Sequence, residues 1–263
     1  MPLSLWEADI VQQDSPAPLA QRRVSQRTRM EENKMNKTGL SRARQSERIR
    51  KMVVTAMLSA IVAVLTFTPI GMIPLPPPLL SATTVHIPVL VAALVEGPAV
   101  GLIVGAVFGL CSFIRAWESG AVGLTLFFRN PLVSVLPRLV VPLVAFGVWA
   151  LLRRLIRPNA VTDKLHSALA AVAGTLTNTV LCLGMIVLLY GGDLTAMINE
   201  MISAGSADAA YLNHAGAWLV AVVGVPNGIG ECLVAAVIVP MIKTAVDAVI
   251  RRSSTRRAKG NQQ

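Results

Sequence analysis

An arginine within a long apolar stretch is the strongest chemical signal in this chain. Arg138 is the only charged residue in the apolar run 131–152. An ionisable side chain inside a membrane is costly unless it has a partner, a cavity or a function. A guanidinium is a planar fork of donors that matches a carboxylate or a phosphate, so Arg138 indicates an anionic ligand. The alternative is a buried ion pair between Arg138 and Glu231, with the other polar groups bonded to neighbouring helices.

Further polar side chains fall at a similar depth in other apolar stretches. Helical rise places Arg138 about 10 Å inside the outer end of its helix. Its companions come from the outer parts of the same helix and three others, which a polar cavity open to the outside would explain. His86 has a second interpretation, because a lone histidine before a proline often bonds only to backbone groups. The candidate ligand-binding residues are His86, Asn130, Arg138, Asn178, Asn227 and Glu231.

Positive charge is confined to three segments of the chain. Of the 24 lysines and arginines, 21 lie in residues 1–51, 152–165 and 243–263. Basic segments beside membrane spans mark the cytoplasmic side. Three such segments on one side require an even number of crossings between each pair. The charge therefore predicts a multi-pass protein of the cell membrane with both termini in the cytoplasm, rather than a nucleic-acid-binding protein.

The apolar stretches predict an all-α membrane protein with six transmembrane helices. Each stretch approaches the roughly 20 residues that a bilayer core requires. Residues 1–51 form a basic tail predicted to be disordered, residues 52–250 the membrane domain, and residues 251–263 a second basic tail. Residues 217–225 are too short to span, and we interpret them as an outer lid or as the bent start of the last helix, broken at Pro226. The expected spans are 52–70, 79–95, 99–114, 131–152, 167–190 and 227–250.

Small residues at helical spacing mark two faces for close packing. Gly97, Gly101, Gly105 and Gly109 fall at every fourth position. Glycines at this spacing let another backbone approach closely, and packing within the chain is the favoured interpretation. A second face, from Ala56 to Ala60, could pack internally or meet a partner subunit.

Motifs for catalysis and nucleotide binding are missing from the sequence. There is no phosphate-binding GxxxxGK[ST] loop, no HExxH and no GxSxG. The cysteines, Cys111, Cys182 and Cys232, are widely spaced and are interpreted as packing residues rather than as disulfides or metal ligands. Trp117, Phe127, Phe128 and Trp218 are interpreted as interfacial anchors more readily than as stacking platforms. Binding and translocation fit the sequence better than catalysis, and we expect no enzyme activity, metal or cofactor.

The chain resembles the substrate-binding S components of energy-coupling factor (ECF) vitamin transporters over residues 52–250. The segments that carry the resemblance are Ala56–Ala60, His86–Pro98, the glycine series through Gly109, Asn130–Arg138, Gly174–Thr179 and Pro226–Glu231 with the apolar run to Pro240. Within that family it is most similar to the pantothenate-type members, although folate and other small vitamin precursors stay open.

The resemblance implies six helices and a vitamin pocket on the outer side. Ligand contacts would come from Asn130, Arg138, Asn178 and Asn227, with Arg138 holding a carboxylate. It also implies docking through Ala56 and Ala60 on a membrane coupling subunit, which two ATPase subunits drive. ATP would be used by those partners and not by this chain.

Two other classes of protein remain as alternatives at this stage. A stand-alone secondary transporter or channel would carry a small solute by itself, driven by an ion gradient. A membrane enzyme or scaffold would retain no ligand, and its loss would not impair uptake.

Overall fold

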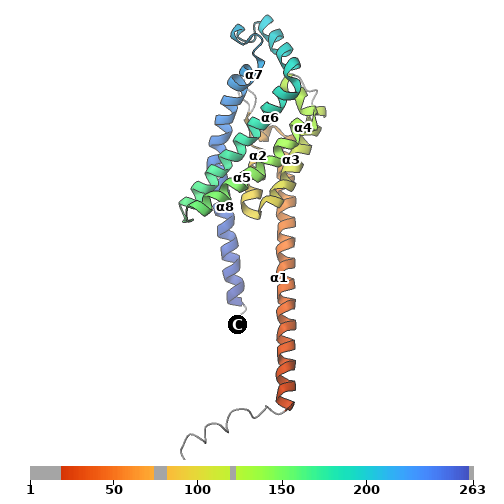
Figure 1. Cartoon of the computed structure of the whole chain (residues 1–263), viewed down its shortest axis with the longest axis vertical. Helices are drawn as coiled ribbons and strands as arrows, with labels where there is room; N and C mark the ends of the chain where they lie inside the picture. The colour runs from red at the N-terminus through yellow and green to blue at the C-terminus, as the bar shows by residue number, and fades with distance from the viewer. Residues whose placement is uncertain (1–18, 74–81, 119–122, 261–263) are drawn as a thin grey trace, which may run out of the picture. The chain divides into compact units, whose positions relative to one another are not determined.

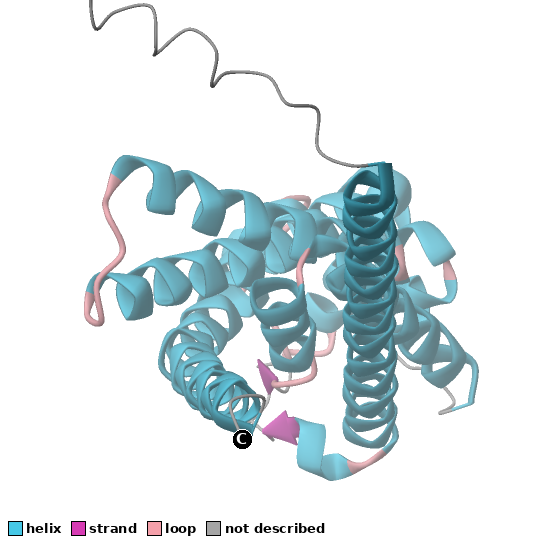
Figure 2. Ribbon diagram, turned by 90° about the horizontal axis from the view of Figure 1, so that it is seen from below, coloured by secondary structure: helices cyan, strands magenta, loops and turns pink. Residues whose placement is uncertain are grey.

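A computed structural model of the chain describes residues 19–73, 82–118 and 123–260 (Figure 1). Contacts divide the chain into two units, residues 1–50 and residues 51–263. Within the described residues the second unit is built from helices, and its two strands, β1 (Met72–Ile73) and β2 (Ala82–Thr83), form one short antiparallel pair (Figure 2). The structure is therefore essentially all-helical, as the sequence predicts.

The described residues of the first unit, 19–50, are helical. The long helix α1 (Leu19–Phe67) includes residues 19–51, which we had expected to belong to a disordered tail. The rest of that expected tail, residues 1–18, lies outside the described residues. Nucleation is the unfavourable step in forming a helix, whereas extending an existing helix adds one hydrogen bond per residue fixed. The apolar part of α1 can supply that nucleus for the polar residues before it.

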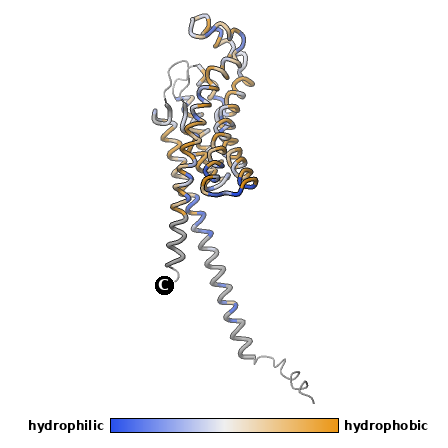
Figure 3. Tube along the Cα trace, turned by 90° about the vertical axis from the view of Figure 1, so that its left-hand side faces the viewer, coloured by the Kyte–Doolittle hydropathy of each residue, from blue (hydrophilic) through white to orange (hydrophobic). Residues whose placement is uncertain are grey.

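Five helical segments are long and apolar enough to cross a membrane (Figure 3). They are Arg44–Phe67, Pro98–Glu118, Pro131–Leu155, Thr162–Ser203 and Ala215–Ile250. The helices themselves are the end of α1, α3 (Pro98–Glu118), α4 (Pro131–Ser134) with α5 (Leu136–Leu155), α6 (Thr162–Ser203), and α7 (Ala215–Trp218) with α8 (Val225–Gly260). Short 3₁₀ turns at Pro69–Gly71, Gly123–Arg129 and Ala209–Tyr211 join some of these elements.

The second expected span, 79–95, is not a full-length helix. Only α2 (His86–Glu96) is helical, and its 11 residues reach about 16 Å, half of a bilayer core. Proline lacks an N–H and fits best in the first turn of a helix, where that donor has no intrahelical acceptor, so Pro88 agrees with a helix start at His86. Thr83 before it is extended and pairs with Met72. Residues 79–81 lie outside the described part of the chain.

The fifth span, expected to end at residue 190, continues for a further 13 residues to Ser203. Gly191 and Gly192 do not stop α6. Tyr190 has a non-helical backbone (φ −131°, ψ 25°), so the helix is kinked there. Beyond the kink, Leu194 and Ile198 are fully buried in an apolar cluster. This burial offsets the low helix propensity of the two glycines.

Residues 217–225 are the bent start of the last helix and not a separate lid. Trp218, at the end of α7, is buried, and the next turn, Leu219–Gly224, is a π-helix that leads directly into α8. Pro226 has no N–H for Val222, which breaks the regular series of hydrogen bonds at this point. The irregularity that Pro226 predicts is therefore a change of helix type in the preceding turn.

Three of the four spaced glycines pack against the neighbouring helices. A Cβ on Gly105 would lie 2.4 Å from the carbonyl oxygen of Arg138, and one on Gly109 would lie 2.8 Å from Cα of Val135. A Cβ on Gly101 would meet Pro142 at 2.8 Å. Gly97 differs, since it links α2 to α3 with φ +101° and has no neighbour within 4 Å of a Cβ. The expected face thus runs from Gly101 to Gly109, because the chain turns at Gly97.

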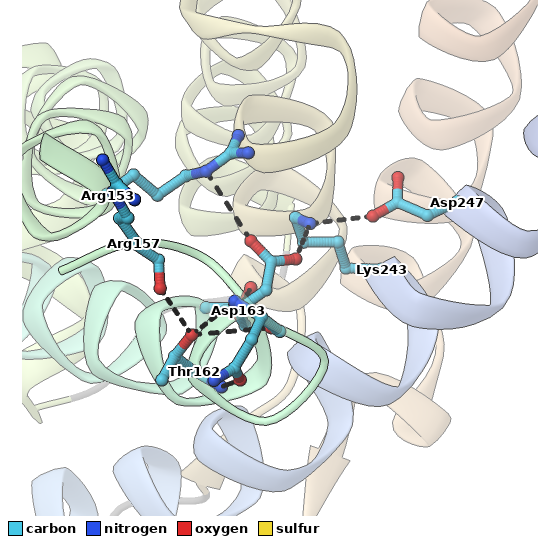
Figure 4. A network of polar contacts seen from close by, with 8 residues as sticks. Arg153, Arg157, Thr162, Asp163, Lys243 and Asp247 are labelled. Carbon is cyan, nitrogen blue, oxygen red and sulfur yellow. Dashed lines mark hydrogen bonds and ion pairs between the residues drawn. The ribbon is translucent and has the colours of Figure 1, made fainter.

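A cluster of charges joins α5, α6 and α8 near the turn between α5 and α6 (Figure 4). Lys243 is 5% exposed, and its Nζ lies 2.8 Å from both Asp163 and Asp247. Arg153 approaches Asp163 at 3.8 Å and lies over the ring of Trp149. Lys243, which the sequence analysis had grouped with the basic C-terminal segment, is thus part of the bundle.

Candidate anion-binding site

The start of α5 fixes the position of Arg138. Pro137 has no N–H and therefore leaves the carbonyl oxygen of Val133 without its helical donor. Arg138 fills that gap, since its Nη1 donates to Val133 O at 2.8 Å. One guanidinium nitrogen is thus held by the backbone break that precedes the arginine. This contact fixes the orientation of the other N–H groups of the guanidinium.

The guanidinium of Arg138 is buried but has no carboxylate partner among the described residues. It is 6% exposed, its Nη1 also contacts Sγ of Cys182 at 2.9 Å, and its Nε is buried without a hydrogen bond. The rings of Phe108 and Phe128 lie 5.2 and 5.1 Å from its Cζ. Such rings favour a cation while leaving its N–H edge available. Among the described residues the site thus combines a positive charge without an ion-pair partner and a buried donor, Nε, without an acceptor.

The ion pair with Glu231, an alternative at the sequence level, is not formed. Glu231 instead accepts hydrogen bonds from the backbone N–H and the hydroxyl of Thr83, at 2.8 and 3.0 Å. Arg138 contacts Cys182 of α6 at 2.9 Å, and Glu231 of α8 binds Thr83, which lies three residues before His86 at the start of α2. We refer to Arg138, Cys182, Glu231 and His86 together as the polar neighbourhood of Arg138.

Two further predicted residues, Asn178 and Asn227, are also buried. Asn178 is 7% exposed, and its Oδ1 lies 3.8 Å from Sγ of Cys182. Asn227 donates from Nδ2 to Val223 O at 3.0 Å, which leaves its buried Oδ1 without a partner. Both ring nitrogens of His86 are buried, and within the described residues the backbone of Thr83 is in reach of the ring. Ligand contact and bonding to backbone groups therefore both remain predictions for His86.

Asn130 has a structural function at the edge of the site. Its Oδ1 caps α4 by accepting from Leu132 N at 3.0 Å, and its Nδ2 donates to the hydroxyl of Tyr190 at 3.0 Å. An N-terminal cap satisfies a donor that the helix itself cannot. The bond to Tyr190 connects this cap with the kink of α6.

Several residues of the site were not identified from the sequence. Cys182 was interpreted as packing and Phe128 as an interfacial anchor, while Phe108 and Thr83 received no function. Cys182 lies one helical turn after Asn178, and this spacing could have placed it on the same face. The stacking of Phe108 and Phe128 on Arg138 depends on tertiary contacts between distant segments.

The expected docking residues lie on an open face of α1. Ala56 and Ala60 are exposed, whereas Val62 on the same helix is fully buried and Leu58 packs beside it in an apolar cluster. A close-approach surface made of small residues is therefore uncovered in this chain.

A separate apolar groove of about 730 Å³ lies between α6 and the α7–α8 helix. Leu183, Gly184, Gly224 and Gly228 line part of it. None of its lining residues belongs to the polar neighbourhood of Arg138. Its almost wholly apolar lining suits hydrocarbon better than an anion.

This chain belongs to the family described as the substrate-specific component of ECF transporters, whose model matches residues 50–243. Two curated relatives are named as transporters of one vitamin. The pantothenate transporter PanT of Leuconostoc mesenteroides is 31% identical over 111 residues, which cover 40% of this chain and 54% of that protein. The pantothenic acid transporter PanT of Lactococcus lactis subsp. cremoris is 28% identical over 137 residues, 46% of this chain and 64% of that protein. The chain thus matches somewhat more than half the length of each relative. Family membership indicates a component of a transporter, and the five long apolar helices among the described residues indicate a multi-pass membrane protein.

Proposed function

We propose that this chain is the substrate-capture subunit of an ECF importer that binds a small anionic, pantothenate-like vitamin from outside the cell. The observation that carries the proposal is the guanidinium of Arg138, buried without a carboxylate and with Nε unsatisfied. A buried donor left without a partner costs about 1–3 kcal/mol, and more when it is charged. A ligand carboxylate would remove that cost.

The surroundings of Arg138 support an anion rather than a neutral ligand. Val133 O and Cys182 occupy Nη1, so a carboxylate would approach the remaining N–H groups. The rings of Phe108 and Phe128 lie 5.2 and 5.1 Å from Cζ of Arg138, and their electron-rich faces favour its positive charge. In-plane approach to the donor edge is the geometry in which guanidinium and carboxylate form two parallel bonds.

The proposed topology places both termini in the cytoplasm and Arg138 near the outer surface. The five long helices and the short α2 would make six crossings. The basic turn between α5 and α6, with Arg153, Arg154 and Arg157, would then face the cytoplasm, in agreement with the distribution of positive charge.

The proposed partners are a membrane coupling subunit and two ATPase subunits. This chain has no phosphate-binding loop, so energy from ATP would come from those partners. The exposed Ala56 and Ala60 on α1 are the proposed contact with the coupling subunit. Small residues at this spacing permit the close helix contact that membrane association needs.

A titration of the purified chain with pantothenate tests the ligand. We expect the Arg138→Gln substitution to weaken binding by about 10- to 150-fold, the equivalent of a charge-assisted hydrogen bond. Arg129→Gln is the matched control, because Arg129 also lies over an aromatic ring, that of Trp117, and donates to a backbone carbonyl outside the site. If Arg138→Gln lowers thermal stability but leaves affinity unchanged, Arg138 is structural and the proposal is wrong.

Reconstitution tests the mechanism separately. Liposomes with this chain and its partner subunits should accumulate radiolabelled pantothenate only when ATP is supplied to the ATPase subunits. Uptake by liposomes with this chain alone, driven by an ion gradient, would instead establish a secondary transporter.

A further inference from the structure

We infer that Cys182 is a positioning residue for anion binding, because its sulfur helps to fix the plane in which the guanidinium of Arg138 offers its donors. The inference rests on the proposed function, since it takes Arg138 as the group that binds the ligand. Cys182 acts through Arg138 and makes no bond of its own to the ligand.

Two hydrogen bonds occupy Nη1 of Arg138. Nη1 donates to Val133 O at 2.8 Å and to Sγ of Cys182 at 2.9 Å. Sγ and Val133 O lie 3.9 Å apart, so the three atoms form a nearly right-angled triangle at Nη1. An angle this wide gives each of the two N–H groups of Nη1 its own acceptor. The plane of the guanidinium is therefore held at two points, and without the sulfur one bond alone would hold it.

The thiol of Cys182 can accept from Arg138 because its own proton has acceptors within reach. Sγ lies 3.8 Å from Oδ1 of Asn178 and 3.9 Å from Val133 O. A thiol is a weak donor and its sulfur a weak acceptor, so both kinds of contact are open to it. Cys182 is 5% exposed, and water has little access to these contacts.

A neutral sulfur orients the guanidinium without compensating its charge. A carboxylate in the place of Cys182 would form an ion pair with Arg138 and compete with a ligand anion. Nε of Arg138 remains buried without a hydrogen bond to any described residue. Because Nη1 is occupied, two parallel bonds to an anion can form only at the edge of the guanidinium that includes Nε. The sulfur therefore selects the edge that the ligand meets.

Serine and alanine in place of Cys182 separate positioning from packing. The two side chains are nearly equal in size and leave a similar gap, but only serine offers an acceptor to Nη1. In a pantothenate titration of the purified chain, Cys182→Ala should weaken binding by about 2- to 12-fold, the equivalent of one ordinary hydrogen bond. Cys182→Ser should recover most of that loss, although thermal unfolding should show the two variants to be similarly stable.

A double variant tests whether Cys182 acts through Arg138. If the sulfur only orients the guanidinium, its loss has no effect once the guanidinium is gone. Cys182→Ala should therefore weaken binding by less than about twofold in the Arg138→Gln background. The matched control is Cys111, a buried cysteine of α3 that makes no hydrogen bond with the described residues. Cys111→Ala and Cys111→Ser should both bind pantothenate as tightly as the unaltered chain.

Three results would overturn this inference and leave the proposed function standing, provided that Arg138→Gln still weakens binding. The first is unchanged affinity in Cys182→Ala. The second is an equal loss in Cys182→Ala and Cys182→Ser, which would assign the cysteine to packing. The third is the same fold-loss from Cys182→Ala with and without Arg138. If Arg138→Gln itself leaves the affinity unchanged, the proposed function fails.

Discussion

Replacement of Gly105 by alanine tests whether the position of Arg138 depends on backbone contact between α3 and α5. The added Cβ would lie 2.4 Å from the carbonyl oxygen of Arg138 and 3.5 Å from Cγ1 of Val89. A carbon and an oxygen normally approach no closer than about 3.2 Å, so α5 would have to move by about 0.8 Å at this point.

The change in stability caused by Gly105→Ala is the sum of two opposing contributions. Overpacking a tight interface costs about 1–3 kcal/mol, and the better helix propensity of alanine returns up to about 1 kcal/mol. We therefore expect a net loss of about 1–2 kcal/mol in stability. Because the displaced backbone carries Arg138, affinity for pantothenate should also fall, by about tenfold, which corresponds to part of one charge-assisted hydrogen bond.

Thermal unfolding in detergent and a pantothenate titration provide the two measurements. The matched control is Gly147→Ala on the same helix α5, where no atom lies within 4 Å of the added Cβ. That variant should be as stable as the unaltered chain or up to about 1 kcal/mol more stable, with the same affinity. If Gly105→Ala and Gly147→Ala behave alike in both assays, the close contact between α3 and the backbone of Arg138 is wrong.

The remaining predictions concern the charge cluster, the docking face and the topology. Lys243→Met should lower stability by about 1–3 kcal/mol and change the affinity for pantothenate little. The expected loss is smaller than for a fully buried ion pair, because the aspartate partners of Lys243 are 30% and 35% exposed. An unchanged melting temperature would show that the charge cluster is not structural. Leucine at both Ala56 and Ala60 should abolish ATP-driven uptake while pantothenate binding persists. The control, Met57→Leu on the same exposed face, should leave uptake intact. Equal uptake by the two variants would contradict the docking assignment. Cysteines placed in 152–165, in a background without the native cysteines, should react with impermeant reagents only from the cytoplasmic side, and labelling from outside would reverse the topology.

The long apolar helices could be predicted from the sequence, since hydrophobic length and the distribution of positive charge are both local properties. The second span could be predicted only in part. Hydrophobicity from residue 79 to 95 suggested a crossing, whereas the helix runs from His86 to Glu96, with Pro88 in its first turn. Pro88 was a local signal for that start but not a sufficient one, because α5 and α8 continue through Pro142 and Pro240.

The extension of α6 was not predictable in the same way. Gly191 and Gly192 are a reasonable local signal for a helix end. The helix continues because Leu194 and Ile198 bury their side chains against residues from the segments around Phe127 and Trp218. Tertiary burial of this kind outweighs local propensity, and only the fold reveals it.

The residues of the polar neighbourhood could be predicted from the sequence, but their hydrogen-bond partners could not. Depth in the membrane selected Arg138, Glu231 and Asn178 without any knowledge of the fold. An ion pair between Arg138 and Glu231 stood as the alternative to an anionic ligand, because an ionisable group in a membrane needs a partner. The structure instead pairs Glu231 with Thr83, a residue 148 positions away whose polar groups carried no charge signal. Contacts that depend on backbone donors cannot be read from side-chain types.

Mass spectrometry of the small molecule that copurifies with this chain shows directly whether Arg138 captures an anion. We expect a small carboxylate to be retained by the unaltered protein and by Arg129→Gln, and to be lost from Arg138→Gln although that variant remains folded. A retained cation or neutral molecule, or equal retention of a carboxylate by all three proteins, would contradict it.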